Sequence, residues 1–509
     1  MSLYEGKDNV FTGLFWQYLS FIVTLLAGLL FYIFAIRLFS TEIIGVFSLL
    51  SAILLLFGNI FSLGLGQGLQ HFISFHLGKG EEGKIRTIIK EFTLLGIALS
   101  LSAFISLWIL SPIFSILFFH TYAFLGYIKL LDVELFAVIF NSFIFSILAG
   151  LQNFKLNAKI TIVNNAVAYG LVAPFLLLNF NAIMILFAWI VGYYLTTSIL
   201  LMVTYRILKR VPGDSKEKMG IRPIIIYSFP ILLSSLIGYG STYIDRFIVS
   251  FFMNLSSLGV YNFSLLIIAA FSILTSPIQV VLLSKLSELY GRDEMANFKM
   301  YASKAINILS ALYMPVALIV AAISPSIILF LTGKQQYLTG DIPIVIILVV
   351  SSLAISKTIM ATTLRAVRRT KIFIITTSVG LFANFVLSAL LIPIFGIEGA
   401  AVGYSSTFMV TFPIVYYYAR KYDTFYIEKV KMLKIFISSF LVFFLLVFIQ
   451  NRLGYSILML FIYVVIGFAV YLFLIRVLNI FSGEDVDLFL GLFPASLNRF
   501  KKLIRSLFL

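Results

Sequence analysis

The sequence predicts an all-α polytopic membrane protein, and three observations lead to this class. Of the 509 residues, 61% are hydrophobic and only 11% are charged, which is too little charge to cover a soluble protein of this size. The uncharged runs 10–36, 43–77, 92–128 and 160–205 are each long enough for at least one helical membrane crossing. These runs lack the alternation of polar and apolar residues that is typical of barrel strands.

Turn residues divide the apolar runs into fourteen expected helices. Ser40-Thr41 separates the first two, Asn254 to Ser257 separates the seventh from the eighth, and Pro393 to Gly399 separates the eleventh from the twelfth. The expected ranges are 10–37, 43–70, 88–118, 133–153, 160–178, 182–205, 223–252, 257–284, 302–331, 342–364, 372–393, 398–419, 433–450 and 455–478. The first apolar run is longer than the apolar region of a signal peptide, which spans about 7–15 residues, so no cleavable signal is expected.

Basic residues are distributed unevenly among the connecting loops. The six loops that follow even-numbered helices hold 25 Lys and Arg residues, whereas the odd-numbered loops hold only Arg37, Lys129, Lys334 and Arg452. Cytoplasmic loops collect Lys and Arg. The sequence therefore predicts a multi-pass protein of the cell membrane with both termini in the cytoplasm. This asymmetry explains most of the net charge of +16 without a nucleic-acid partner.

The sequence also contains an internal repeat. Gly45 in IGVF recurs as Gly259 in LGVY at an offset of 214, Leu151 recurs as Leu364 at 213, and Gly192 as Gly403 at 211. The repeat predicts two homologous six-helix bundles of the same orientation plus a C-terminal helix pair. A duplicated bundle of this kind places its substrate path between the halves. The expected domains are a first bundle at 1–205, a cytoplasmic linker at 206–222, a second bundle at 223–425, and helices 13–14 with a basic amphipathic tail at 426–509.

Several segments resemble a known family. They are STEIIGVFSLL after the first helix, FSLGLGQGLQHFISFHLGKGEEGK closing the second, YIDRFIVSFFM in the seventh, and IPIFGIEGAAVGYS joining the eleventh and twelfth. In this order, they are similar to the polysaccharide transporters of the multidrug/oligosaccharidyl-lipid/polysaccharide exporter superfamily, a branch that includes O-antigen-type flippases. The resemblance implies alternating access that moves a lipid-linked oligosaccharide from the cytoplasmic to the outer leaflet, for surface polysaccharide or glycoprotein assembly.

Charged residues inside the expected helices are candidates for substrate binding. Asp245 and Arg246 are adjacent in the seventh helix and point about 100° apart, so they do not pair with each other. A water-filled cavity would accommodate both, and an interfacial pair is the alternative. For Lys357 the alternative is snorkelling to the headgroups, and for Arg37 it is plain anchoring at a helix end. These cations would neutralise the phosphate or pyrophosphate of the carrier lipid.

Amide side chains form a second group of candidates. Asn164, Asn165 and Gln279 suit the hydroxyl groups of a sugar, and interhelical hydrogen bonding is the alternative for each. The chain has no cysteine, so thiol catalysis and thiolate metal sites are excluded. No nucleotide or metal motif occurs. We therefore expect no catalytic residue, no metal and no cofactor, and an enzyme acting on the same lipid carriers is disfavoured.

The rival function is a cation-coupled multidrug antiporter of the same superfamily. Such proteins tend to carry an intramembrane carboxylate in the first half. In this sequence Asp132 and Glu134 lie at the edge of the expected fourth helix, which argues against that function. The expected partners are a lipid-linked saccharide and membrane lipid, and we expect a monomer. The sugar, the lipid carrier, the choice of phosphate or pyrophosphate, and coupling to H⁺ or Na⁺ stay open.

Overall fold

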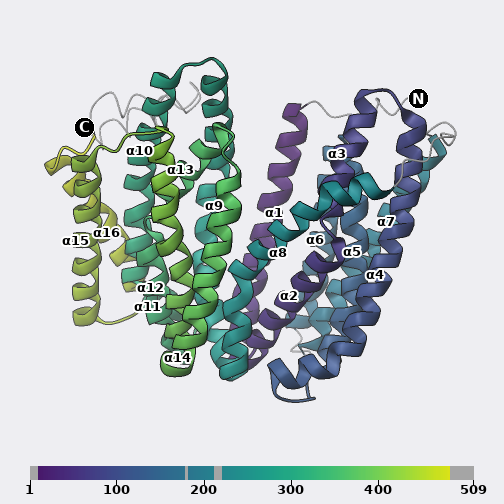
Figure 1. The fold of residues 1–509 in the computed structure, drawn as a ribbon. Coiled ribbons are helices and arrows are strands. Elements are labelled where there is room, and N and C mark those ends of the chain that lie inside the picture. Colours follow the sequence, from purple (N-terminus) through teal and green to yellow (C-terminus); the bar gives the residue numbers. More distant parts are fainter. Residues whose placement is uncertain (1–9, 178–181, 211–220, 482–509) are drawn as a thin grey trace. The chain divides into compact units, whose positions relative to one another are not determined.

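The computed structural model describes residues 10–177, 182–210 and 221–481. These residues form helices joined by short turns, and no strand occurs among them (Figure 1). In the part of the chain described, ten helices are long and apolar enough to cross a membrane, or eleven if one bent pair counts as a single crossing. The predicted all-α membrane class is confirmed, whereas the count of fourteen helices stays a prediction.

Two compact units divide the chain, Met1–Gly259 and Val260–Leu509. The helices of the first unit are α1 (Val10–Leu38), α2 (Thr41–Ser62), α3 (Leu65–Gly78), α4 (Glu82–Phe119), α5 (Leu125–Gly150), α6 (Phe154–Leu177), α7 (Ile183–Arg210) and α8 (Ile221–Phe252). Helix α5 is central to this unit, because it packs against α2, α3, α4, α6 and α7. Helix α8 packs against α2, α3 and α4.

Helix α9 (Leu255–Gly291) begins in the first unit and continues into the second. The second unit also holds α10 (Met295–Ala322), α11 (Ser324–Thr332), a 3₁₀ turn at Gln335–Gly340, α12 (Asp341–Ser351), α13 (Ala354–Ala366), α14 (Lys371–Lys421), α15 (Lys429–Leu453) and α16 (Ile457–Val477). Its centre is α10, which contacts α12, α13 and α15. Helix α16 is linked to α10 by a hydrogen bond: the Tyr471 hydroxyl donates to the Ala311 carbonyl at 2.6 Å.

The repeated stretch that contains Gly45 and Gly259 forms a close helix crossing. A Cβ on Gly45 would lie 1.9 Å from the carbonyl oxygen of Leu255, and a Cβ on Gly259 would lie 1.9 Å from that of Thr41. Each glycine therefore contacts the carbonyl group four residues before the other glycine, so the two contacts are equivalent by the repeat. The backbones of α2 and α9 approach this closely because both positions lack a side chain.

The same two helices begin with equivalent side-chain caps. The Ser40 hydroxyl accepts from the Ile43 amide at 3.3 Å. In the second copy, the Asn254 side chain accepts from the Ser257 amide at 2.8 Å. The predicted turns at Ser40-Thr41 and at Asn254 to Ser257 are thus confirmed, and both satisfy an amide that has no partner within the helix.

The expected second helix, 43–70, is broken in the structure. Leu63 and Gly64 have φ values of 51° and 65°, which end α2 and start α3 in a new direction. Gly64 and Gly68 then lie against α8, where a Cβ on Gly68 would be 2.3 Å from the Ser228 hydroxyl. The glycines in GLGQG therefore serve both the break and the close packing of α3 on α8.

Other expected boundaries also differ from the structure. Helix α5 begins at Leu125, eight residues before the expected start at 133, because the helix continues through the charged residues Lys129 and Asp132. The expected tenth helix is broken after Ser351 into α12 and α13. In α14 the chain reverses at Gly396, where φ is 59° and ψ is −134°, as the turn predicted at Pro393 to Gly399 requires.

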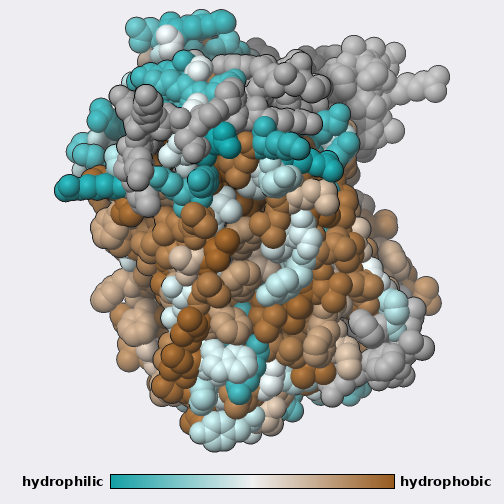
Figure 2. Space-filling view, turned by 90° about the vertical axis from the view of Figure 1, so that its right-hand side faces the viewer, coloured by the Kyte–Doolittle hydropathy of each residue, from teal (hydrophilic) through white to brown (hydrophobic). Residues whose placement is uncertain are grey.

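Apolar side chains on the outside of the helices indicate the surface that meets lipid. On α4, Leu101, Ile105, Ile109 and Ile113 are exposed at intervals of four residues, which places them on one helix face. Figure 2 shows hydrophobic side chains over most of the visible face and hydrophilic ones gathered towards one end. A soluble protein does not expose a continuous apolar surface of this kind.

Candidate functional site

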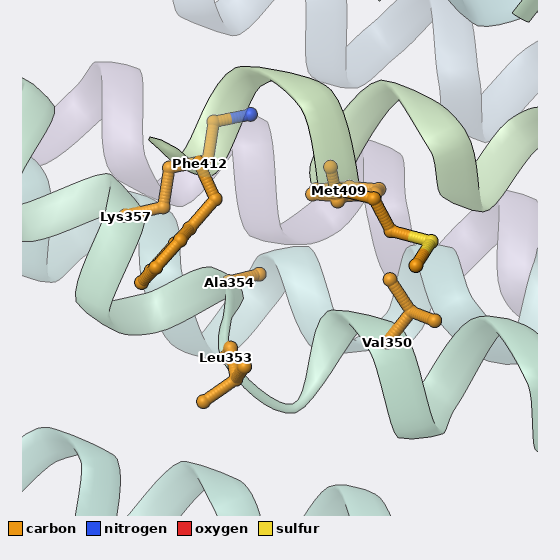
Figure 3. A pocket seen from close by; sticks show the side chains of 7 residues that line it. Val350, Leu353, Ala354, Lys357, Met409 and Phe412 are labelled. Carbon is orange, nitrogen blue, oxygen red and sulfur yellow. The ribbon is translucent and has the colours of Figure 1, made fainter. Parts of the chain in front are cut away.

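The second unit contains a cavity at the break between α12 and α13. Its volume is about 250 Å³. The lining residues are Val350, Leu353, Ala354 and Lys357 from the broken helix, and Phe408, Met409 and Phe412 from the second arm of α14 (Figure 3). Lys357 supplies the only charge in an otherwise apolar lining.

The Lys357 ammonium group lies 5.0 Å from the centre of the Phe408 ring, within the range of a cation–π interaction. In the described part of the chain, no hydrogen bond or ion pair involves this side chain. The Lys357 side chain is half-buried, and an ammonium group away from water is costly unless an anion accompanies it. The cavity is the place beside Lys357 where an anion would fit.

A pair of serines accounts for the break that opens this cavity. The Ser351 hydroxyl bonds the Leu348 carbonyl at 3.3 Å, and the Ser352 hydroxyl bonds the Val349 carbonyl at 2.6 Å. Side-chain hydroxyls that bond the preceding turn in this way bend helices. The two segments, taken with the 3₁₀ turn before α12, meet at an angle of 42°.

Asp245 and Arg246 lie on α8 in the first unit. Asp245 is fully buried, whereas Arg246 is partly exposed, as expected for neighbours that face different sides of a helix. The Arg246 guanidinium lies 4.2 Å from the centre of the Tyr243 ring. Tyr243 stacks on Tyr239 at 4.9 Å, and the Tyr239 hydroxyl donates to the Ala52 carbonyl of α2 at 2.6 Å. Two stacked rings thus hold the cation against a fixed neighbouring helix.

The two predicted asparagines take part in bonds between helices. Asn164 on α6 accepts a hydrogen bond from Thr196 of α7 at 2.9 Å. Asn165 donates to Thr24 of α1 at 2.5 Å. Both side chains are buried, so these bonds tie α6 to its neighbours in the first unit.

The remaining predicted residues lie elsewhere. Arg37 is exposed in the last turn of α1, where a cation interacts favourably with the helix dipole. Gln279 belongs to α9, and its side chain lies outside the described residues. The structure therefore places Asp245 and Arg246 on one helix of the first unit, and Lys357 at a cavity in the second. Among the described residues, no group of three His, Asp or Glu side chains is arranged to hold a metal.

Two acidic residues lie deeper inside a helix than the sequence predicts. Asp132 and Glu134 were expected at the edge of a helix, but α5 begins at Leu125 and both lie inside it, 0% and 2% exposed. Within the described part of the chain, both Asp132 carboxylate oxygens and the Glu134 Oε2 are buried without a hydrogen-bond partner. Buried carboxyl groups without partners are frequent at functional sites. Helical continuation through LGYIKLLD was the signal that would have shown their position.

Comparisons with known structures identify the fold. An inward closed conformation of the lipid II flippase MurJ matches with a TM-score of 0.71 at 16% identity, over 91% of this chain and 98% of that chain. An inward-facing multidrug resistance MATE family transporter of the MOP superfamily matches at 0.65 and 14% identity, over 78% and 94%. A MOP superfamily transporter from Pyrococcus furiosus matches at 0.54 and 14% identity, over 80% and 92%. At these identities the matches show a shared fold.

Comparisons of the sequence itself give one family. The model of the family described as polysaccharide biosynthesis protein matches residues 33–339, which is more than half of the chain. Curated proteins give no significant match.

Proposed function

The chain belongs to the polysaccharide biosynthesis protein family, as its sequence motifs indicate, and we propose that it is a flippase for a lipid-linked oligosaccharide. The cargo is carried on a polyprenyl phosphate or pyrophosphate and moves from the cytoplasmic to the outer leaflet of the cell membrane. The family match over residues 33–339 carries this proposal. A fold shared with the lipid II flippase MurJ supports it.

The proposed arrangement has fourteen crossings, with both termini in the cytoplasm. Support comes from the ten apolar helices, the bent α12–α13 pair and the reversal of α14 at Gly396, which divides that helix into two arms. The 25 basic residues of the even-numbered loops support the orientation. Two six-helix bundles and a terminal pair would then account for the membrane-crossing helices that the structure describes.

Two cations are proposed to hold the headgroup. Lys357 lies beside a cavity of about 250 Å³, and a phosphate there would supply the anion that this ammonium group needs. Arg246 is held on Tyr243, and its planar guanidinium can bind a phosphate through two parallel hydrogen bonds. Neutralising the headgroup lowers its cost of crossing the membrane. No bond is made or broken in this process.

The other candidates have weaker roles in the proposal. Arg37 and Gln279 remain proposed contacts to the carrier and the sugar. Asn164 and Asn165 would have to exchange an interhelical bond for one to a sugar hydroxyl. We therefore assign these two amides first to packing within the first unit.

A second candidate function is cation-coupled multidrug antiport. The buried acids Asp132 and Glu134 favour it, because an unpartnered buried carboxylate can bind a proton or a sodium ion. The cations Arg246 and Lys357 favour the flippase, because an anionic lipid suits them better than a cationic drug does.

The deciding experiment removes the gene and restores it in variant form. Without the gene, lipid-linked oligosaccharide is expected to accumulate on the inner leaflet while the surface glycan disappears. Wild type and Arg292→Ala, an exposed arginine paired with Glu288, should restore the glycan. Arg246→Ala should not restore it at equal membrane abundance. A normal surface glycan combined with build-up of cationic dyes in the deleted cells would establish the antiporter instead.

A further inference from the structure

A second cavity in the second unit lies where α15 begins and α16 ends. Its volume is about 520 Å³, and its walls include Glu428, Lys429, Lys431, Lys434 and Asn479. Both helices are candidate membrane spans. The cavity is therefore at the boundary between hydrocarbon and water, and it is separate from the cavity beside Lys357.

The walls of this cavity carry an excess of positive charge. Three lysines face a single carboxylate, and that carboxylate already has two donors. Lys431 pairs with Glu428 at 2.8 Å, and Asn307 donates to the same side chain at 2.8 Å. Among the described residues that line the cavity, Lys429 and Lys434 therefore have no carboxylate partner.

The two other lysines differ in how they are held. Lys434 donates to the Leu478 carbonyl at 2.7 Å, at the end of α16. Lys429 is exposed, and in the described part of the chain no hydrogen bond or ion pair involves its side chain. Lys434 thus fixes the geometry of the cavity, while Lys429 is available to an incoming anion.

The start of α15 adds to the positive potential. Its first turn contains no acidic residue, and the side chain of the preceding Glu428 does not cap the helix. The amide groups at a helix N-terminus carry partial positive charge, so a lysine there is unfavourable unless an anion is present. An anion in the cavity would compensate both the lysines and the helix end.

An apolar stripe leads from the cavity along α15. Val430 lines the cavity, and Leu433, Ile437 and Leu441 follow it at intervals of three or four residues. These four side chains are between 45% and 69% exposed. They share one face of the helix. A ligand with an anionic head and apolar chains would therefore satisfy the cavity and the stripe together.

We propose that this cavity binds the phosphate headgroup of an anionic phospholipid, whose acyl chains lie along the stripe. Basic pockets between membrane helices are suited to phospholipid headgroups, and a lysine holds a phosphate as a point charge. The lipid is a resident ligand of the α15–α16 pair and not the cargo. The inference does not depend on the proposed flipping of saccharides.

The test measures lipid binding to the purified full chain by native mass spectrometry and by thermal stability. The probes are phosphatidylglycerol, zwitterionic phosphatidylcholine and inorganic phosphate. Wild type should bind phosphatidylglycerol at least tenfold more tightly than phosphatidylcholine, and high salt should weaken that binding. In Lys429→Gln/Lys431→Gln the preference should disappear.

A matched control removes two charges from the end of α14, on the other side of the loop that connects α14 to α15. Arg420→Gln/Lys421→Gln changes exposed residues that do not line the cavity, and it should keep the preference. The single variant Lys429→Gln should show a partial loss with an unchanged melting temperature in lipid-free detergent. Equal binding by the cavity variant and wild type would overturn the proposal. Release of phosphatidylglycerol by millimolar inorganic phosphate would also overturn it, in favour of a soluble anion.

Discussion

Helix α5 and the broken helix α12–α13 occupy equivalent places in the sequence repeat, yet they carry charges of opposite sign. At the offset of 213 that relates Leu151 to Leu364, the acids Asp132 and Glu134 correspond to Val345 and Ile347. In the other direction, Lys357 corresponds to Ile144, which is fully buried. Each half therefore has apolar residues where the other half has charge.

The two helices also differ in continuity. The serines that break the second helix, Ser351 and Ser352, correspond to Val138 and Ile139 in α5, and α5 is unbroken. The broken helix has a cavity beside its charge, Lys357. Within the sequence repeat, a few polar residues therefore distinguish the broken helix from its continuous counterpart.

The largest loss of stability is expected at the helix crossing formed by Gly45 and Gly259, where the two copies of the repeat agree. Gly45→Val and Gly259→Val should each destabilise the protein by at least about 1–3 kcal/mol, because overpacking a close contact costs this much. Each new side chain would meet a backbone carbonyl. Thermal unfolding in detergent measures the loss, and the two variants should behave alike.

Gly58→Ala in α2 is the matched control for this crossing, because a Cβ there meets nothing within 4 Å. It should leave the melting temperature unchanged or slightly raised. If one of the valine variants were tolerated and the other were not, the crossing would not be a symmetric feature of the repeat.

The next effect concerns the charge in the second unit. Lys357→Met keeps the volume of the side chain and removes its charge, and it should lower flipping about 10–100-fold. This range corresponds to the roughly 1.5–3 kcal/mol of a hydrogen bond to a charged group. The assay follows a polyprenyl-linked saccharide in proteoliposomes, at equal amounts of reconstituted protein.

The equivalent position in the first unit provides the control for that assay. Ile144→Met is a volume-conserving change in a buried site and should cost less than about 1.5 kcal/mol of stability, with flipping unchanged. Lys357→Arg should retain part of the activity. Full activity in Lys357→Met would remove this lysine from the substrate path.

The smallest effect is expected from the acids of α5. The proposed flippase assigns no cargo contact to these two carboxylates, so Glu134→Gln and Asp132→Asn should change flipping by less than about twofold. Flipping and export of a cationic dye are measured in the same proteoliposomes. Dye export that depends on a cation gradient and vanishes in Glu134→Gln would favour the antiporter.

Several features of the fold and site were predictable from local patterns. The serine and asparagine caps before α2 and α9 and the reversal near Gly396 follow from the preferences of single residues for turns. The break at Leu63-Gly64 differs from the continuous helix expected over 43–70. The break at Ser351-Ser352 was not predicted, because serine pairs bend some helices and leave others straight. The start of α5 differs from the expected one because the charges of Lys129 and Asp132 interrupt the apolar pattern without ending the helical hydrogen bonding.

The amino-acid sequence by itself determined the membrane class, the excess of basic residues in alternate loops, the repeat and the family, because composition and spacing carry these features. Only the tertiary structure decided that α8 packs on α2 and α3, that Asp132 and Glu134 are buried without described partners, and that Lys357 lies beside a cavity. Helices in a membrane gain little from hydrophobic attraction to one another, so their partners are selected by shape and by polar contacts. Such contacts depend on residues far apart in the sequence, and single helices do not reveal them.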